Sequence, residues 1–80
     1  MMTASFSEVQ LIMAEVFGVE PDKITMDSTP DTIESWDSLR LLNLILAFEK
    51  EFNIEIQIEQ LPLMLSTPKI LEILNEAMSK

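Results

Sequence analysis

The 80-residue sequence contains no cysteine, no histidine and no tyrosine, and it has a single glycine. Without cysteine, the chain has no disulfide, no thiolate metal site and no cysteine nucleophile. Without histidine, it lacks the commonest general base and the commonest metal ligand. One glycine does not make a glycine-rich phosphate-binding loop. The chain therefore has few groups with which to catalyse a reaction, and a reactive thiol would have to come from a prosthetic group.

Basic residues are scarce as well, with five lysines and arginines against fourteen acidic residues and a formal net charge of −9. Such a charge repels nucleic acid and anionic membrane surfaces, and it attracts basic protein surfaces. The acidity would also keep a small protein in solution, and both effects can hold together. We therefore expect protein partners and no nucleic-acid partner.

The sequence has no apolar run close to the roughly 20 residues of a membrane span. Its N-terminus lacks the basic segment and the apolar stretch of a signal peptide. The length predicts one small domain, residues 1–80, near the size at which a single core only just stabilises a fold. We expect a cytoplasmic monomer that does not insert into membranes.

The most informative stretch is a predicted helix that begins at Asp37 and Ser38, two residue types that cap helices well. At about 100° per residue, one arc of this helix is apolar and forms a predicted core face. The core face comprises Leu41, Leu44, Ile45, Phe48 and Phe52. The outward face comprises Leu39, Asn43, Leu46 and Lys50, with Arg40 and Ala47 beside it. Ser38 lies between the two faces, so we expect an exposed hydroxyl where a helix N-terminus favours an anion.

A shorter helix and a long ordered loop are predicted before this central helix. Ser5 and Glu8 have the spacing of a capping box, and Gly18 suits the left-handed position that ends a helix. Residues 19–36 form a connection that is long for a compact domain, with a helical turn expected at residues 21–24. Isolated apolar residues can pin this loop to a core; they are Val19, Ile24, Ile33 and Trp36.

The C-terminal third predicts an extended connection and two further helices. Residues 53–58 alternate like a strand but have no second strand to pair with, so we interpret them as a connection that buries Ile54 and Ile56. The proline-interrupted residues 59–65 allow one or two helical turns, and Thr67 and Pro68 are expected as N-cap and first residue of the last helix. The predicted fold is all-α: a small four-helix bundle with three main helices, a short third helix and a long ordered loop between helices 1 and 2.

The sequence Asp37-Ser38-Leu39, at the start of a helix that ends in FEKEFNIEI (residues 48–56), resembles the centre of acyl carrier proteins. The resemblance extends over nearly all 80 residues, whereas on the motif alone the pair would simply be a helix cap. It implies that Ser38 is the attachment residue for 4′-phosphopantetheine, which a phosphopantetheinyl transferase moves from coenzyme A. It also implies that Asp37 helps to orient this transferase.

One local departure from the family precedes the motif. Acyl carrier proteins commonly have a glycine shortly before Asp-Ser-Leu, where this chain has Ser35 and Trp36. We interpret Trp36 as an anchor in the core, with a partner contact beside Ser38 as the alternative.

The resemblance implies a non-catalytic carrier that holds acyl intermediates as thioesters on its arm. Its partners would be the transferase and acyl-activating, acyltransferase or synthase enzymes, and no catalytic residue and no metal ligand is assigned. In related carriers the cargo can retreat between the central helix and the short third helix. The matching positions here are Leu41, Phe48, Ile56, Leu61 and Met64, for which ordinary core packing is the alternative.

The outward face of the central helix carries the predicted partner contacts. These are Asp37, Leu39, Arg40, Asn43, Leu46 and Lys50. Carriers of primary fatty-acid synthesis are acidic along this face and dock on basic patches, whereas this chain places Arg40 and Lys50 there. The difference favours a specialised carrier for fatty-acid-like, polyketide or modified-lipid biosynthesis, with drift on a tolerant surface as the alternative.

Two other functions remain open on the sequence. An aminoacyl or peptidyl carrier, or a D-alanyl carrier, would have the same fold, serine and arm. An unmodified acidic helical interaction domain belongs to a different class, and in such a domain Ser38 would only cap a helix. Modification of the chain by a transferase separates this last class from every carrier.

Overall fold

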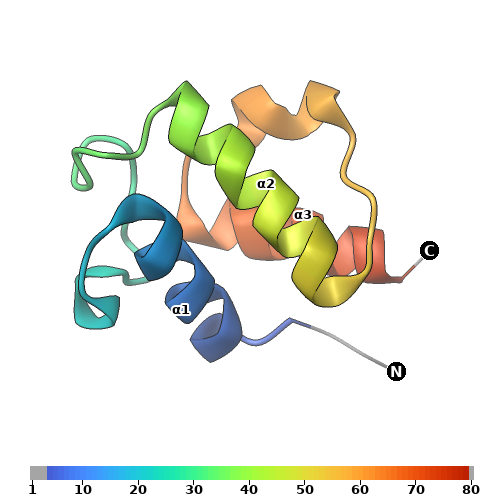
Figure 1. Ribbon diagram of the computed structural model, residues 1–80, viewed down its shortest axis with the longest axis horizontal. Helices are drawn as coiled ribbons and strands as arrows, with labels where there is room; N and C mark the ends of the chain where they lie inside the picture. The colour runs from blue at the N-terminus through green and yellow to red at the C-terminus, as the bar shows by residue number, and fades with distance from the viewer. Residues whose placement is uncertain (1–3, 80) are drawn as a thin grey trace.

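The computed structural model describes residues 4–79, which form three α-helices, two 3-10 helices and no strand (Figure 1). Helix α1 spans Phe6–Phe17, α2 spans Ser38–Phe52 and α3 spans Thr67–Met78. The short segments are η1 (Pro21–Lys23) in the first loop and η2 (Ile58–Leu63) between α2 and α3. The predicted all-α bundle with a short third helix and a long first loop is confirmed. No helix within residues 4–79 is both long and apolar enough to cross a membrane.

The ends of α1 and α2 follow from local capping residues. The Ser5 hydroxyl accepts a hydrogen bond from the Glu8 amide at 3.3 Å, and the Glu8 carboxylate accepts one from the Ser5 amide at 3.1 Å. This reciprocal pair is the predicted capping box. Gly18 ends α1 with φ 69°, in the left-handed region that glycine adopts without steric cost. Asp37 is the N-cap of α2, and Asn53 ends that helix with φ 53°.

The prediction for the start of α3 was wrong by one residue. Ser66 is the N-cap, because its hydroxyl accepts from the Lys69 amide, and Thr67 is already helical. The Thr67 side chain is buried and donates to the carbonyl oxygen of Thr25 at 2.7 Å. Two neighbouring hydroxyl residues could each cap this helix, and the contact with the first loop determines which of them does.

The core lies between the three α-helices and contains the predicted apolar face of α2. Leu44 and Phe48 are fully buried, and Leu41 and Ile45 are nearly so. Phe52, predicted on the same face, is only half-buried, because it lies in the last turn of the helix beside two cavities. The extended connection after α2 is also less buried than predicted, since Ile56 is buried but Ile54 is only partly buried.

The long first loop is ordered by apolar side chains that reach the core, as predicted. Ile24, Ile33 and Trp36 are buried, and Val19 is half-buried. The Trp36 indole stacks on the Phe17 ring with centroids 5.2 Å apart. With 4% of its surface exposed, Trp36 is a core anchor, so the alternative of a partner contact was wrong. This anchor fixes the chain immediately before α2.

Candidate functional site

The candidate site is the start of α2, where Ser38 is the first helical residue and is exposed. The Asp37 side chain accepts from the Arg40 amide at 2.9 Å, and the Asp37 carbonyl accepts from the Leu41 amide at 2.8 Å. Within residues 4–79, the Ser38 hydroxyl and the amides of Ser38 and Leu39 make no hydrogen bond. These amides are among the N–H groups that a helix start leaves unpaired, and they favour a bound anion.

The backbone on both sides of Ser38 is tied to the end of α1. The Ser35 hydroxyl donates to the carbonyl oxygen of Phe17 at 2.7 Å, and Arg40 Nη1 donates to the carbonyl oxygen of Val16 at 3.0 Å. Carbonyls in the last turn of a helix have no intrahelical partner, and a cation there also interacts well with the helix dipole. The start of α2 is therefore positioned by the C-terminus of α1.

This contact adds a structural role to Arg40. The residue was predicted to contact partners beside the outward face, and it is exposed, but its guanidinium group also bonds to the end of α1. Leu39, Asn43, Leu46 and Lys50 are exposed as predicted, and on α2 they fall within one narrow arc. Asp37 is exposed too, with its carboxylate occupied as the cap of α2.

Exposed apolar residues extend beyond those that the sequence indicated. Leu39 and Leu46 are 69% and 56% exposed, and Leu42 on the same helix is 38% exposed. Further exposed residues lie on and after η2, namely Ile58, Leu63 and Leu65. Leu39, Leu42 and Leu46 stand at helical spacing in the sequence, so this stripe could have been predicted. The exposure of the η2 residues had no comparable periodic signal.

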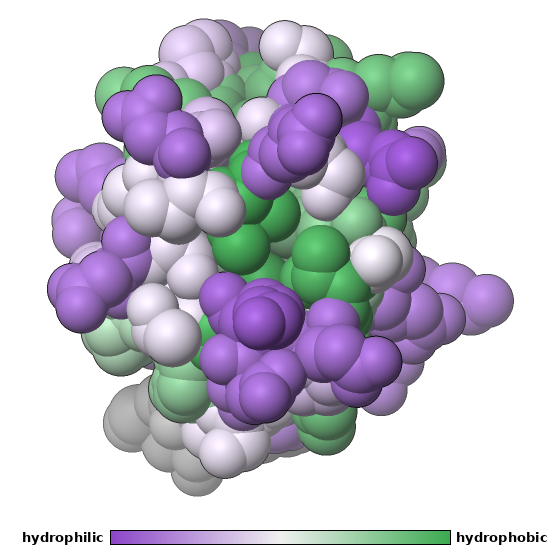
Figure 2. Space-filling view, turned by 90° about the vertical axis from the view of Figure 1, so that its left-hand side faces the viewer, coloured by the Kyte–Doolittle hydropathy of each residue, from purple (hydrophilic) through white to green (hydrophobic). Residues whose placement is uncertain are grey.

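A groove lies between the end of α1 and the first loop, directly beside the start of α2. Its volume is about 680 Å³. Figure 2 looks onto the side of the molecule that carries this loop and shows apolar surface between hydrophilic side chains. The groove is lined by Phe17, Gly18, Val19, Lys23, Thr32, Ile33, Glu34, Ser35, Asp37 and Arg40. No sequence pattern indicated it, because its walls come from three separate segments.

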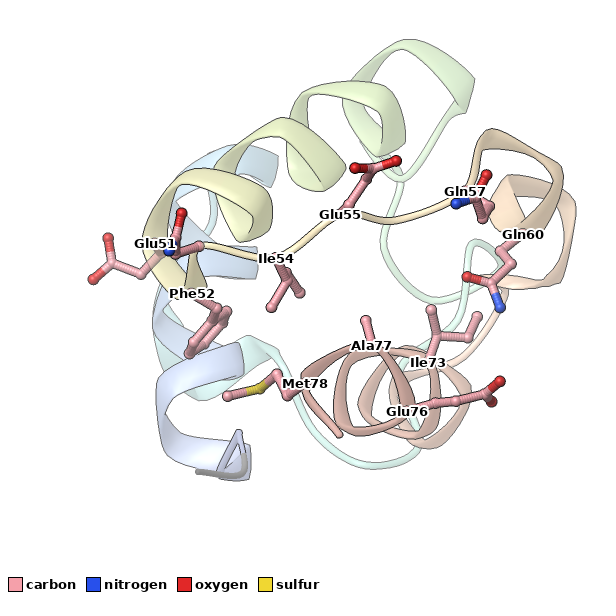
Figure 3. Close-up of a pocket in the computed structure, with 11 residues that line it drawn as sticks. Glu51, Phe52, Ile54, Glu55, Gln57, Gln60, Ile73, Glu76, Ala77 and Met78 are labelled. Carbon is pink, nitrogen blue, oxygen red and sulfur yellow. The ribbon is translucent and has the colours of Figure 1, made fainter. Parts of the chain in front are cut away.

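A second cavity, of about 670 Å³, lies between the end of α2, the extended connection and α3 (Figure 3). Ile54 and Ala77 point into its opening, whereas Glu51 and Glu76 point away from it. The connection is held against α2, because the Ile56 amide donates to the Glu49 carboxylate at 3.0 Å.

The residues predicted to receive cargo do not line this cavity. Leu41, Phe48, Ile56 and Met64 are buried in the core, and Leu61 is half-buried against it. In this structure the first four belong to the core and Leu61 packs against it, which was the alternative considered for these residues.

Comparisons with known proteins agree with this geometry. A protein-family model described as "Phosphopantetheine attachment site" matches residues 7–75. An acyl carrier protein from Petrotoga mobilis is 31% identical over an alignment of 75 residues, with 92% of this chain and 87% of that protein covered.

Solved structures show the same fold. A chain in the structure of the ishigamide ketosynthase/chain length factor is 27% identical, with a TM-score of 0.77 and 94% of each chain covered. The oxytetracycline acyl carrier protein is 19% identical with a TM-score of 0.78, covering 99% of this chain and 86% of that one. Hexanoyl acyl carrier protein from the actinorhodin polyketide synthase of Streptomyces coelicolor is 16% identical with a TM-score of 0.81, covering 98% and 94%. The last two likenesses bear on the fold alone.

The prosthetic group of such a domain is 4′-phosphopantetheine. The start of α2 fits this group, since it offers an exposed hydroxyl for a phosphodiester and unpaired amides that favour the phosphate charge.

Proposed function

The chain belongs to the acyl carrier protein family, and we propose that it carries acyl intermediates as thioesters on 4′-phosphopantetheine attached through Ser38. The observation that carries the choice of residue is the accessibility of three neighbouring serines. Ser28 is buried, and its hydroxyl accepts from the Thr25 amide at 2.8 Å. The Ser35 hydroxyl is bonded to α1. Of these three hydroxyls, that of Ser38 alone is both exposed and unpaired within residues 4–79.

Ser38 serves in this proposal as an attachment point and not as an activated nucleophile. The chain has no histidine, no lysine stands next to Ser38 in the sequence, and the carboxylate of Asp37 is bonded to the Arg40 amide. Phosphopantetheine supplies, when bound, a thiol that forms thioesters, and its tether raises the local concentration of the acyl group at a partner enzyme. The chain then acts as a single non-catalytic carrier domain. Asp37 contributes by fixing the helix start that the transferase recognises.

We further infer a specialised pathway of the polyketide type. The exposed stripe of Leu39 and Leu46 with Lys50 supports this, because it differs from the acidic docking face of primary fatty-acid carriers. The similarity to a chain in the ketosynthase/chain length factor structure, at 27% identity, supports the same inference. The proposed partners are a phosphopantetheinyl transferase and a synthase enzyme such as a ketosynthase.

The attachment residue is tested by incubating the protein with coenzyme A, Mg²⁺ and a broad-specificity transferase. Intact mass should rise by one phosphopantetheine, and tandem mass spectrometry should place it on Ser38. Ser38→Ala should abolish the addition, whereas Ser7→Ala, at an exposed serine on α1, should leave it unchanged. Addition at Ser28 or Ser35, or no addition, would contradict the proposal.

The cargo class is tested on the modified protein. Adenylating enzymes for amino acids and acyltransferases for carboxylic acids would be offered in parallel. Loading with an acyl group supports the proposal, and loading with amino acids alone would assign the chain to the aminoacyl or peptidyl carriers.

A further inference from the structure

The groove beside the start of α2 is not accounted for by attachment at Ser38 alone. At about 680 Å³ it falls within the range of roughly 300–1,000 Å³ that is typical of small-molecule sites. Its apolar floor includes the buried side chains of Phe17 and Ile33 and the half-buried Val19. An apolar floor with a polar rim is the usual composition of a site for an amphipathic ligand.

The rim combines both signs of charge. Lys23 and Arg40 line it, which are two of only five basic residues in a chain with a formal net charge of −9. Glu34 and Asp37 also line it and provide carboxylate acceptors. The rim can therefore pair with an anionic phosphodiester and also accept hydrogen bonds from amide and hydroxyl groups.

The position of the groove indicates which ligand would bind in it. Asp37 immediately precedes Ser38 and Arg40 lies two residues after it, and both line the groove. Ser38 does not line the groove itself, but it lies between these two residues in the sequence, so a long flexible group attached to it is tethered close to the groove and meets it at a high effective concentration. The cavity at the other end of α2 first involves Glu51, roughly 20 Å further along the helix at 1.5 Å per residue.

We propose that the groove between α1 and the first loop holds the pantetheine arm when the arm is attached to Ser38. The inference rests on the proposed function. The apolar floor accommodates the gem-dimethyl group of pantetheine, and the polar rim accommodates its amides, its hydroxyl and the phosphodiester. Ser35 and Arg40 keep the groove in shape, because their bonds to the Phe17 and Val16 carbonyls tie its two walls together.

The test compares backbone and methyl NMR spectra of the unmodified and the phosphopantetheinylated protein. Shifts are expected at Val19, Lys23 and Ile33, which line the groove but are distant in sequence from Ser38. Shifts confined to residues 36–40 would overturn the inference. Shifts at Ile54 and Met78 in their place would assign the arm to the cavity beside α3 and would overturn it equally.

A matched pair of variants checks that the groove itself is responsible. Glu34→Trp fills the groove from its exposed rim, whereas Glu20→Trp places the same side chain at an exposed position outside it. The shifts at Val19 and Lys23 should be lost in the first variant and kept in the second. Equal shifts in both would contradict the inference, and the wild-type comparison remains decisive should the first variant fail to fold.

Intact mass separates the two proposals. A wild-type protein that takes up no phosphopantetheine would remove the proposed function and this inference with it. A modified protein without shifts in the groove would overturn this inference alone.

Discussion

Arg40 on α2 donates a hydrogen bond across 3.0 Å to the carbonyl oxygen of Val16 in the last turn of α1. Together with the bond from Ser35 to Phe17, this contact holds the residues on either side of Ser38 against α1. Arg40 therefore has a structural role in addition to any effect of its charge on partners. A substitution that reverses its charge would alter both at once, so partner choice is better tested elsewhere on α2.

Replacing Arg40 with methionine should lower the free energy of unfolding by about 1 kcal/mol, since one hydrogen bond from a charged donor at an exposed position is lost. Methionine keeps most of the aliphatic stem. Urea denaturation would measure the change. Lys50→Met is the matched control, because Lys50 is exposed on the same helix and makes no hydrogen bond or ion pair within residues 4–79. Equal losses in the two variants would contradict the role of Arg40.

Phe48→Ala should destabilise the fold by about 3–5 kcal/mol, the usual cost of removing a fully buried aromatic side chain. That is a large part of the stability of so small a protein. Thermal and urea denaturation would measure it. Leu46→Ala on the exposed side of α2 should cost far less. A Phe48→Ala midpoint close to wild type would mean that α2 packs with another face.

Two substitutions at the start of α3 test the different roles of the Ser66 and Thr67 hydroxyls. Ser66→Ala removes the N-cap and should cost about 1 kcal/mol. Thr67→Val keeps the shape of the side chain but leaves the Thr25 carbonyl without its donor, which should cost about 1–3 kcal/mol. Urea denaturation of both variants is the measurement. If Ser66→Ala left the free energy of unfolding unchanged, the assignment of Ser66 as the N-cap would be wrong.

Partner choice is tested at Lys50, which is exposed on the outward face of α2. Lys50→Glu should increase acyl transfer between the modified protein and a ketosynthase of bulk fatty-acid synthesis. The glutamate carboxylate would be attracted to the enzyme's basic patch, whereas this patch repels the lysine of the wild-type protein. The gain should appear mainly in the association rate and shrink as the salt concentration rises.

The control for this experiment is Lys69→Glu on α3, where Lys69 pairs with Glu72 at 3.6 Å. The same charge change away from the outward face should leave transfer near the wild-type rate. Equal gains from both variants would show that net charge alone matters. A wild-type rate equal to that of a bulk fatty-acid carrier would remove the case for a specialised partner.

The sequence predicted what depends on local chemistry and periodicity. Ser5, Gly18 and Asp37 end or begin helices through contacts within a few residues, so each could be identified from its neighbours. The apolar face of α2 follows from helical spacing, and Leu44 and Phe48 are buried accordingly.

The features that the sequence did not reveal depend on contacts between distant segments. The Thr67 hydroxyl bonds to the Thr25 carbonyl, and the Arg40 guanidinium bonds to the Val16 carbonyl at the end of α1. The groove beside Ser38 is assembled from α1, the first loop and α2, and periodicity within one segment cannot predict such a site. The exposure of Ser38 was predictable, whereas the pairing of the Ser35 hydroxyl that distinguishes it from Ser38 was not.

Tandem mass spectrometry of the protein isolated from its native cells tests the central claim most directly. The peptide that contains Ser38 should carry phosphopantetheine, and a fraction of it should carry an acyl group in a thioester that hydroxylamine releases. An unmodified Ser38, or a phosphopantetheine group on any other residue, would contradict the account.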